Sequence, residues 1–198
     1  MNGGGFVKFQ KKANYDYESN GITEENGYEK WYEWDKVKKP VRYLGIFLVA
    51  LMFALGRVFK NELAAFGKIN VIIAAFAALA TLIVIVVPVH ELLHLLVMSK
   101  GKLDDKCIIT AGGGAVSALY NGHISRNRYL VCLVTPCVVL AAVFALAVIL
   151  SHGIFRLYFI YLLIMSCVSG YTDIYMFFYL LRHIGKDEII FGIYKKKM

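Results

Sequence analysis

The amino-acid sequence predicts an all-α membrane protein with four transmembrane helices and a short cytosolic β-hairpin between the second and third helices. Three observations predict this class. First, 59% of the 198 residues are hydrophobic and only 18% are charged, with a mean hydropathy of +0.58, which is typical of membrane chains and not of soluble domains. Second, the chain contains four long apolar runs. Third, the number of lysines and arginines alternates between high and low in the segments that join these runs.

Residues 1–40 form the first of two predicted domains, a polar and aromatic cytosolic arm. Its end combines large aromatic side chains with lysines, namely Trp31, Tyr32, Trp34, Lys36, Lys38 and Lys39. Aromatic rings beside basic side chains are typical of the lipid headgroup region. We therefore expect this end of the arm to be an interfacial anchor.

The second predicted domain, residues 41–198, contains the membrane spans. We expect them at about 41–59, 69–99, 129–151 and 154–183. Each run approaches or exceeds the roughly 20 residues that cross ~30 Å of hydrocarbon. Within the second span, Pro88 has no N–H to donate to the carbonyl of Val84, so the helix should kink there.

The loop between the second and third expected spans, residues 100–128, should have structure of its own. A short run, A-V-S-A-L-Y, precedes Asn121-Gly122, a dipeptide typical of tight hairpin turns. We predict a hairpin over Ala115–Arg126, with a plain surface loop as the alternative. By adding a strand, it would hold an extended peptide substrate, and the candidate binding residues are Ala115, Val116, Ser117, Ala118, Leu119 and Tyr120.

Lysine and arginine counts predict the orientation. The arm up to Arg42 has eight, and the four later connecting or terminal segments have three, five, one and five. Because cytosolic loops are enriched in these residues, the alternation places both termini in the cytosol of a multi-pass cell-membrane protein. The formal charge of +8 lies in blocks beside apolar runs. We therefore expect the lipid bilayer, and not nucleic acid, as the partner of these charges.

The chain has four cysteines, namely Cys107, Cys132, Cys137 and Cys167, and no two of them form a C-x-x-C pair. Three of the four lie inside apolar runs. Small buried apolar side chains are the expected role, in preference to disulfides or zinc thiolates.

The second span contains His90, Glu91 and His94 in the pattern H-E-x-x-H. Residues four apart on a helix lie on one face, so both imidazoles can reach one metal ion. Glu91 can touch a water on that metal without being a ligand. Ionisable groups at membrane depth are costly and usually functional, which favours a zinc site over two histidines bonded to neighbouring groups.

A catalytic zinc usually takes a third protein ligand. At ~1.5 Å per residue, His94 and His90 lie roughly 8 and 14 Å from the cytosolic end of their span, and Asp173 lies at a similar depth in the last span. Ser166, Ser169 and Gly170 share its helical face. Asp173 is therefore the preferred ligand, and His123 stays open. Less favoured candidates are Asp104, Asp105, His152 and His183.

These motifs resemble a known family. The segment H-E-L-L-H, then S-R-N-R-Y-L entering a span with Pro136, then S-G-Y-T-D-I near the end of the last span, is similar to the bacterial family of uncharacterised multi-pass membrane proteins described as putative zincin peptidases. In outline it also resembles site-2 intramembrane metalloproteases. The resemblance covers roughly residues 80–195.

The resemblance implies a membrane-embedded zinc metalloprotease that hydrolyses peptide bonds of a membrane or membrane-proximal protein. His90, His94 and Asp173 would be the Zn²⁺ ligands, and Glu91 the general base. Two other classes stay open: an inactive membrane scaffold with or without metal, and a small ion transporter that relays ions or protons through His90, Glu91 and Asp173. The absence of an internal repeat argues against the transporter.

Overall fold

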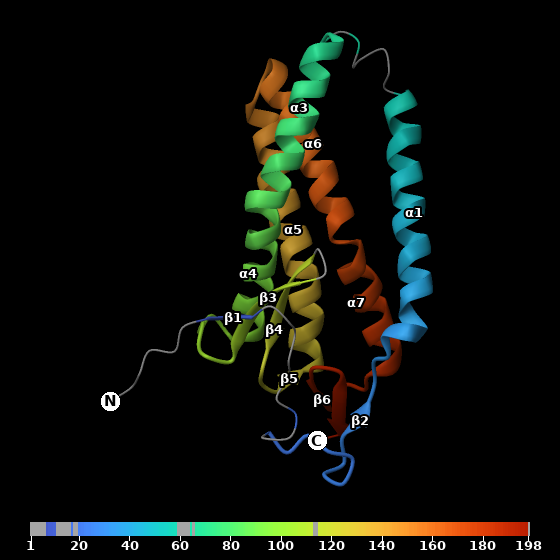
Figure 1. Cartoon of the computed structure of the whole chain (residues 1–198), viewed down its shortest axis with the longest axis vertical. Coiled ribbons are helices and arrows are strands. Elements are labelled where there is room, and N and C mark those ends of the chain that lie inside the picture. Colours follow the sequence, from blue (N-terminus) through green and yellow to red (C-terminus); the bar gives the residue numbers. More distant parts are fainter. Residues whose placement is uncertain are drawn as a thin grey trace, which may run out of the picture. The chain divides into compact units, whose positions relative to one another are not determined.

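The computed structural model describes residues 7–10, 17, 20–58, 64, 66–112 and 115–197. Its helices are α1 (Trp34–Val58), α3 (Lys68–Thr81), the π-helical turn η1 (Leu82–Val86), α4 (Val87–Met98), α5 (Arg126–Leu150), α6 (Gly153–Ser169) and α7 (Tyr171–His183) (Figure 1). Its strands are β1 (Lys8–Gln10), β2 (Glu29–Lys30), β3 (Cys107–Gly112), β4 (Ala115–Tyr120), β5 (Ile124–Ser125), β6 (Glu188–Phe191) and β7 (Tyr194–Lys197).

The chain separates into two compact units. The first combines Met1–Trp34, Pro88–Pro136 and Asp173–Met198, and the second combines Asp35–Val87 and Cys137–Thr172. All the strands belong to the first unit, together with nearly all of α4 and α7. In the residues described, the regular secondary structure of the second unit is entirely helical.

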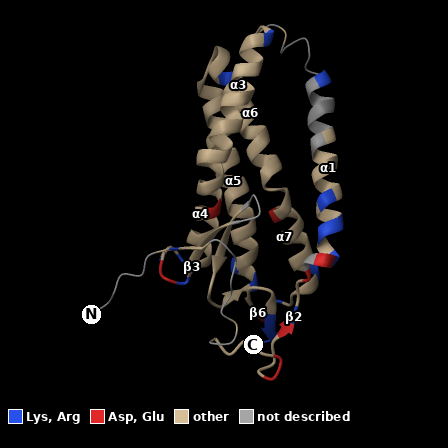
Figure 2. Ribbon diagram, in the orientation of Figure 1, with Lys and Arg blue, Asp and Glu red and all other residues tan. Residues whose placement is uncertain are grey.

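Three helical stretches of the described residues are long and apolar enough to cross a membrane: Lys68–Met98, Arg126–Leu150 and Gly153–His183. Charged residues lie mainly in the strands, in their connections and near helix ends, and the middles of α3, α5 and α6 have none (Figure 2). Length, composition and this charge pattern indicate a membrane protein.

The prediction of an all-α protein with four spans is wrong. Besides having only three candidate spans among its described residues, the chain forms a three-stranded and a four-stranded sheet. Most of the expected first span, 41–59, falls within α1. That helix begins at Trp34 and so includes four charged residues ahead of Val41, namely Asp35, Lys36, Lys38 and Lys39.

In the second unit, α3 packs against α6. The hydroxyls of Thr81 and Tyr158 share a hydrogen bond of 2.8 Å between these helices. Large apolar side chains on the outer surface of the unit are exposed, including Phe76 and Phe155, both at 67%. Such exposure is costly in water and suits contact with lipid chains.

The turn η1 occupies the position just ahead of Pro88. In a regular α-helix the N–H of residue 88 would bond to the carbonyl of Val84, and proline has no N–H. In the structure, the N–H of Val87 reaches back five residues to the carbonyl of Leu82. A single π-helical turn of this kind is often found beside a functional site, and here it immediately precedes the H-E-x-x-H segment.

The first unit contains both sheets. One has the order β1-β3-β4, with β1 parallel and β4 antiparallel to β3, so β4 lies at its edge. The other has the order β2-β7-β6-β5 and is antiparallel throughout. Residues of the N-terminal arm thus pair with segments far along the chain: Lys8 is opposite Ile108, and Glu29 is opposite Lys195.

The hairpin between α4 and α5 exists, but its predicted position over Ala115–Arg126 is wrong. β4 forms the hairpin with β3, the strand that precedes it, and Gly112 is opposite Ala115. β5 pairs instead with β6 in the other sheet. Asn121-Gly122 therefore leads from one sheet to the other. A Cβ atom added at Gly122 would lie 2.6 Å from the Tyr120 ring, so this site needs glycine because the ring folds over it.

Trp31 belongs to a buried core and not to the bilayer surface as expected. Its side chain is 6% exposed and packs with Leu133, Leu180 and Ile190. The indole N–H donates to the carbonyl of Gly192 at 3.2 Å. The core of the first unit therefore fixes the arm at this residue.

Candidate metal centre

His90 and His94 lie one turn apart on α4, and both are buried, with exposures of 8% and 7%. Their Nε2 atoms are 3.1 Å apart, and their rings are nearly perpendicular, at 77°. The i, i+4 spacing accounts for this meeting. Two imidazole nitrogens that face each other this closely can share only one proton, so a cation between them would satisfy both lone pairs.

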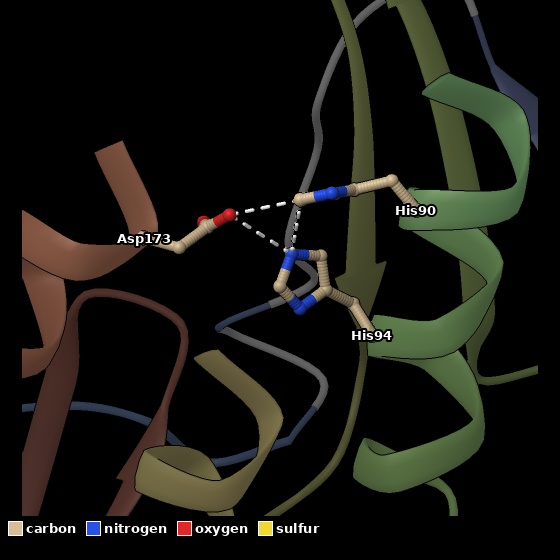
Figure 3. A group of neighbouring side chains, drawn as sticks. All are labelled: His90, His94 and Asp173. Atoms are coloured by element: carbon tan, nitrogen blue, oxygen red, sulfur yellow. Dashed lines mark hydrogen bonds and ion pairs between the residues drawn. The ribbon is translucent and has the colours of Figure 1, made fainter. Parts of the chain in front are cut away.

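Asp173 completes the group from the first turn of α7. Its Oδ2 lies 2.9 Å from Nε2 of His90 and 3.5 Å from Nε2 of His94 (Figure 3). A carboxylate in the first turn of a helix is favoured by the helix dipole. All three residues belong to the first unit.

The three ligand atoms fit a zinc ion. Their separations are 3.1, 2.9 and 3.5 Å. Zinc bonds of ~2.0–2.1 Å in tetrahedral geometry place ligand atoms about 3.3–3.4 Å apart. Two imidazoles and a carboxylate are also a donor set that zinc accepts, with a fourth position left for water or substrate. Among the described residues, these three make up a possible metal-binding group.

The second ring nitrogens of the two histidines differ in their surroundings. Nδ1 of His94 lies 3.0 Å from the main-chain oxygen of Cys132 and 3.3 Å from its sulfur. The thiol in turn donates to the carbonyl of His94 at 3.6 Å. Nδ1 of His90 is buried and has no hydrogen-bond partner among the described residues. His94 is therefore the more firmly oriented of the two.

Glu91 connects the H-E-x-x-H helix to the hairpin. Its Oε2 accepts a hydrogen bond of 2.6 Å from the main-chain N–H of Ala118 in β4. This N–H points away from β3, because the N–H of Asn121, three residues on, bonds to Lys106 on the β3 side and antiparallel strands alternate. The free edge of β4 therefore lies beside Glu91.

The candidate peptide-binding residues lie along this strand. Ala115, Val116, Ser117, Ala118, Leu119 and Tyr120 make up β4. By the same alternation, the main-chain groups of Val116, Ala118 and Tyr120 face the free edge, and those of Ser117 and Leu119 pair with β3. Among them, Ala118 contacts the H-E-x-x-H segment directly, through its hydrogen bond to Glu91.

The structure places the other third-ligand candidates in contacts of their own. Asp104 accepts from the N–H of Lys106, and Asp105 lies 3.9 Å from Lys8 on the surface. His183 bonds to the carbonyl of Tyr179 and stacks on its ring. His152 precedes α6 in the second unit.

His123, the candidate left open, bonds to the Tyr28 hydroxyl at 2.7 Å and packs edge-on against Phe191. Partial burial, together with the charges of Lys106 and Lys196, holds the pKa of His123 below its ordinary value. The histidine therefore joins the arm to the four-stranded sheet.

The side chains of Ser166, Ser169 and Cys132 differ from what the sequence pattern led us to expect. Ser166 and Ser169, which share a face with Asp173 in the sequence pattern, direct their hydroxyls to carbonyls of their own helix. Cys132, expected to be a small buried apolar side chain, is buried and also touches His94. Four residues later, Pro136 has no N–H to donate to the Cys132 carbonyl.

Comparison with protein families matches residues 83–185, just over half of the chain, to a family described as "Putative zincin peptidase". The match includes H-E-x-x-H, the hairpin, Cys132 and Asp173. Searches of curated proteins and of solved structures gave no match. The chain belongs to the putative zincin peptidase family.

Proposed function

We propose that this protein is a membrane-embedded, zinc-dependent endopeptidase that cleaves a membrane or membrane-proximal protein. The observation that carries the proposal is the meeting of three ligand atoms, Nε2 of His90, Nε2 of His94 and Oδ2 of Asp173, within 4.8 Å of one another. Glu91 follows the first ligand directly, and family membership points to the same chemistry.

Each residue has a distinct task in this proposal. His90, His94 and Asp173 would hold the ion. Zinc in such a site polarises the scissile carbonyl and makes a water molecule acidic near neutral pH. Glu91 takes a proton from the attacking water at a carboxylate oxygen and delivers it to the amide nitrogen as the carbon–nitrogen bond breaks. The products are a carboxylic acid and an amine.

The edge of β4 would hold the substrate. An extended peptide added to a free edge gains main-chain hydrogen bonds and exposes its peptide bonds, which a helix would hide. A carbonyl oxygen of the bound peptide would accept the hydrogen bond from the Ala118 N–H in place of the Glu91 carboxylate. Substrate binding would thereby release the Glu91 carboxylate beside the reacting bond.

The distribution of basic residues favours a site on the cytosolic side of the cell membrane. β2 and β7, from the two terminal segments, pair with each other in the unit that holds the hairpin. The connecting and terminal segments of this unit are rich in basic residues, including Lys100, Lys102, Lys106, Arg126, Arg128, Lys186, Lys195, Lys196 and Lys197. Cytosolic segments carry such an excess.

The test uses the full chain purified in lipid nanodiscs. Zinc is measured by elemental analysis, and cleavage is followed on a library of membrane-protein peptides before and after treatment with a chelator. We expect close to one zinc per chain, loss of cleavage with the chelator and recovery on adding zinc. A metal-free protein, or cleavage that the chelator does not change, would contradict the proposal.

A further inference from the structure

Pro136 lies inside α5, ten residues after the helix begins, and is almost fully buried. In a regular helix the N–H of residue 136 would bond to the carbonyl of residue 132. Proline has no N–H, and its ring crowds the carbonyl four residues earlier. The carbonyl of Cys132 therefore lacks its usual helical donor.

The oxygen of that same carbonyl lies 3.0 Å from Nδ1 of the His94 imidazole. The carbonyl oxygen can only accept a hydrogen bond, so Nδ1 must carry the proton. In a neutral imidazole, Nε2 then keeps its lone pair. Nε2 is the atom that faces His90 and Asp173.

We propose that Pro136 is a positioning residue for the metal centre: by withholding an N–H from the Cys132 carbonyl, it fixes the tautomer and the ring orientation of His94. Metal-bound histidines commonly donate their other ring N–H to an acceptor, and loss of that acceptor costs about 10–100-fold in metal affinity. The inference rests on the proposed function only in that the ion is zinc.

The sulfur of Cys132 is the rival explanation, since it lies 3.3 Å from Nδ1 of His94. The two explanations separate by mutation. Cys132→Ala removes the sulfur and keeps the carbonyl. Pro136→Ala keeps the sulfur and supplies the helix with an N–H that competes for the carbonyl.

The experiment compares the wild-type chain, P136A and C132A in nanodiscs, with Thr135→Ala as a control in the same helix, because the Thr135 hydroxyl bonds to Val131 and does not reach the centre. The His94 tautomer is read from long-range ¹H–¹⁵N spectra without metal. Zinc affinity is measured by competition with a chromogenic chelator, and thermal unfolding shows whether each variant is folded.

We expect the wild type to have His94 protonated at Nδ1. P136A should have mixed tautomers and bind zinc about 10–100-fold more weakly, whereas C132A and T135A should stay within about threefold of wild type. A P136A protein with the wild-type tautomer and affinity, or a C132A protein that loses both, overturns the inference.

Two other results are also decisive. If P136A does not fold, the wild-type spectrum can still overturn the inference, because a His94 protonated at Nε2 contradicts it by itself. If the wild-type chain binds no zinc, the proposed function fails, and the tautomers of the metal-free proteins still test Pro136.

Discussion

The carboxylate of Glu91 accepts a hydrogen bond from the main-chain N–H of Ala118, 2.6 Å away. One group is the proposed proton carrier, and the other belongs to the proposed substrate-binding edge. A peptide strand added at β4 would compete directly with Glu91 for that N–H. In the proposed mechanism, substrate binding and release of the base would therefore be coupled through one hydrogen bond.

Glu91→Gln should abolish turnover and leave zinc in place. The amide oxygen of glutamine can still accept from Ala118, but the side chain cannot take a proton from water. General-base catalysis contributes about 10²–10⁴-fold, so kcat should fall by at least ~100-fold with unchanged zinc content. Parallel kinetics and elemental analysis measure both quantities, with exposed Glu24→Gln as the control. Cleavage by E91Q at the wild-type rate would refute the mechanism.

Asp173→Ala should weaken zinc binding by more than ~100-fold, because even an outer hydrogen-bond partner of a ligand is worth about 10–100-fold. Competition with a chelator measures the dissociation constant. Asp187→Ala, which removes an exposed carboxylate beyond α7, is the matched control and should bind zinc normally. Unchanged affinity in D173A would show that another group supplies the third ligand, and His123→Ala would be tested next.

Ala118→Pro and Leu119→Pro should behave differently although they are neighbours. The Ala118 N–H faces the free edge, so proline there removes no bond between β4 and β3. A118P should fold, bind zinc and show a KM raised about fivefold, since one hydrogen bond of ~1 kcal/mol to the substrate is lost. L119P removes a ladder hydrogen bond and should lower thermal stability. Equal effects in the two variants would contradict the proposed substrate edge.

His123 should make the attachment of the arm pH-dependent. Its pKa is lowered by burial and by the charges of Lys106 and Lys196, so the folded state favours the neutral ring, which shares a hydrogen bond with the Tyr28 hydroxyl. A group with a lowered pKa contributes stability above its ordinary value of about 6.5, and this stability is lost as the pH falls below it.

Hydrogen exchange of residues 22–31 at pH 7.5 and 5.5 measures this effect. Protection should decrease at the lower pH in the wild type. His123→Gln should remove most of that difference, and His152→Gln, in the second unit, should keep it. A wild-type arm with equal protection at both pH values would exclude the role assigned to His123.

The long apolar helices could be predicted from the sequence, because an apolar run of about twenty or more residues is typical of a membrane-spanning helix. The three candidate spans among the described residues begin and end within three residues of their expected limits. Local spacing also explains why His90 and His94 meet. Helical depth pointed to Asp173, whose Oδ2 the structure places beside both Nε2 atoms; zinc binding by this group is still a prediction.

The strands were harder to predict because their partners are remote. β7 reads Y-K-K-K and β2 is only E-K, so neither shows the apolar alternation that identifies a strand. The main-chain pairing of Glu29 with Lys195 joins residues that are nearly the whole chain apart, which no local pattern reveals. One local signal was available: the two-residue link Gly192-Ile193 between β6 and β7, with Gly192 at φ +55°, is typical of a tight hairpin.

The register between β2 and β7 also has a consequence for biosynthesis. A ribosome that adds ~5–20 residues per second needs roughly ten to forty seconds for 198 residues. Throughout most of that time β2 has been made and its partner has not, and Asp173 is likewise absent from His90 and His94. The nascent chain thus cannot bring Asp173 to His90 and His94 until late in its synthesis.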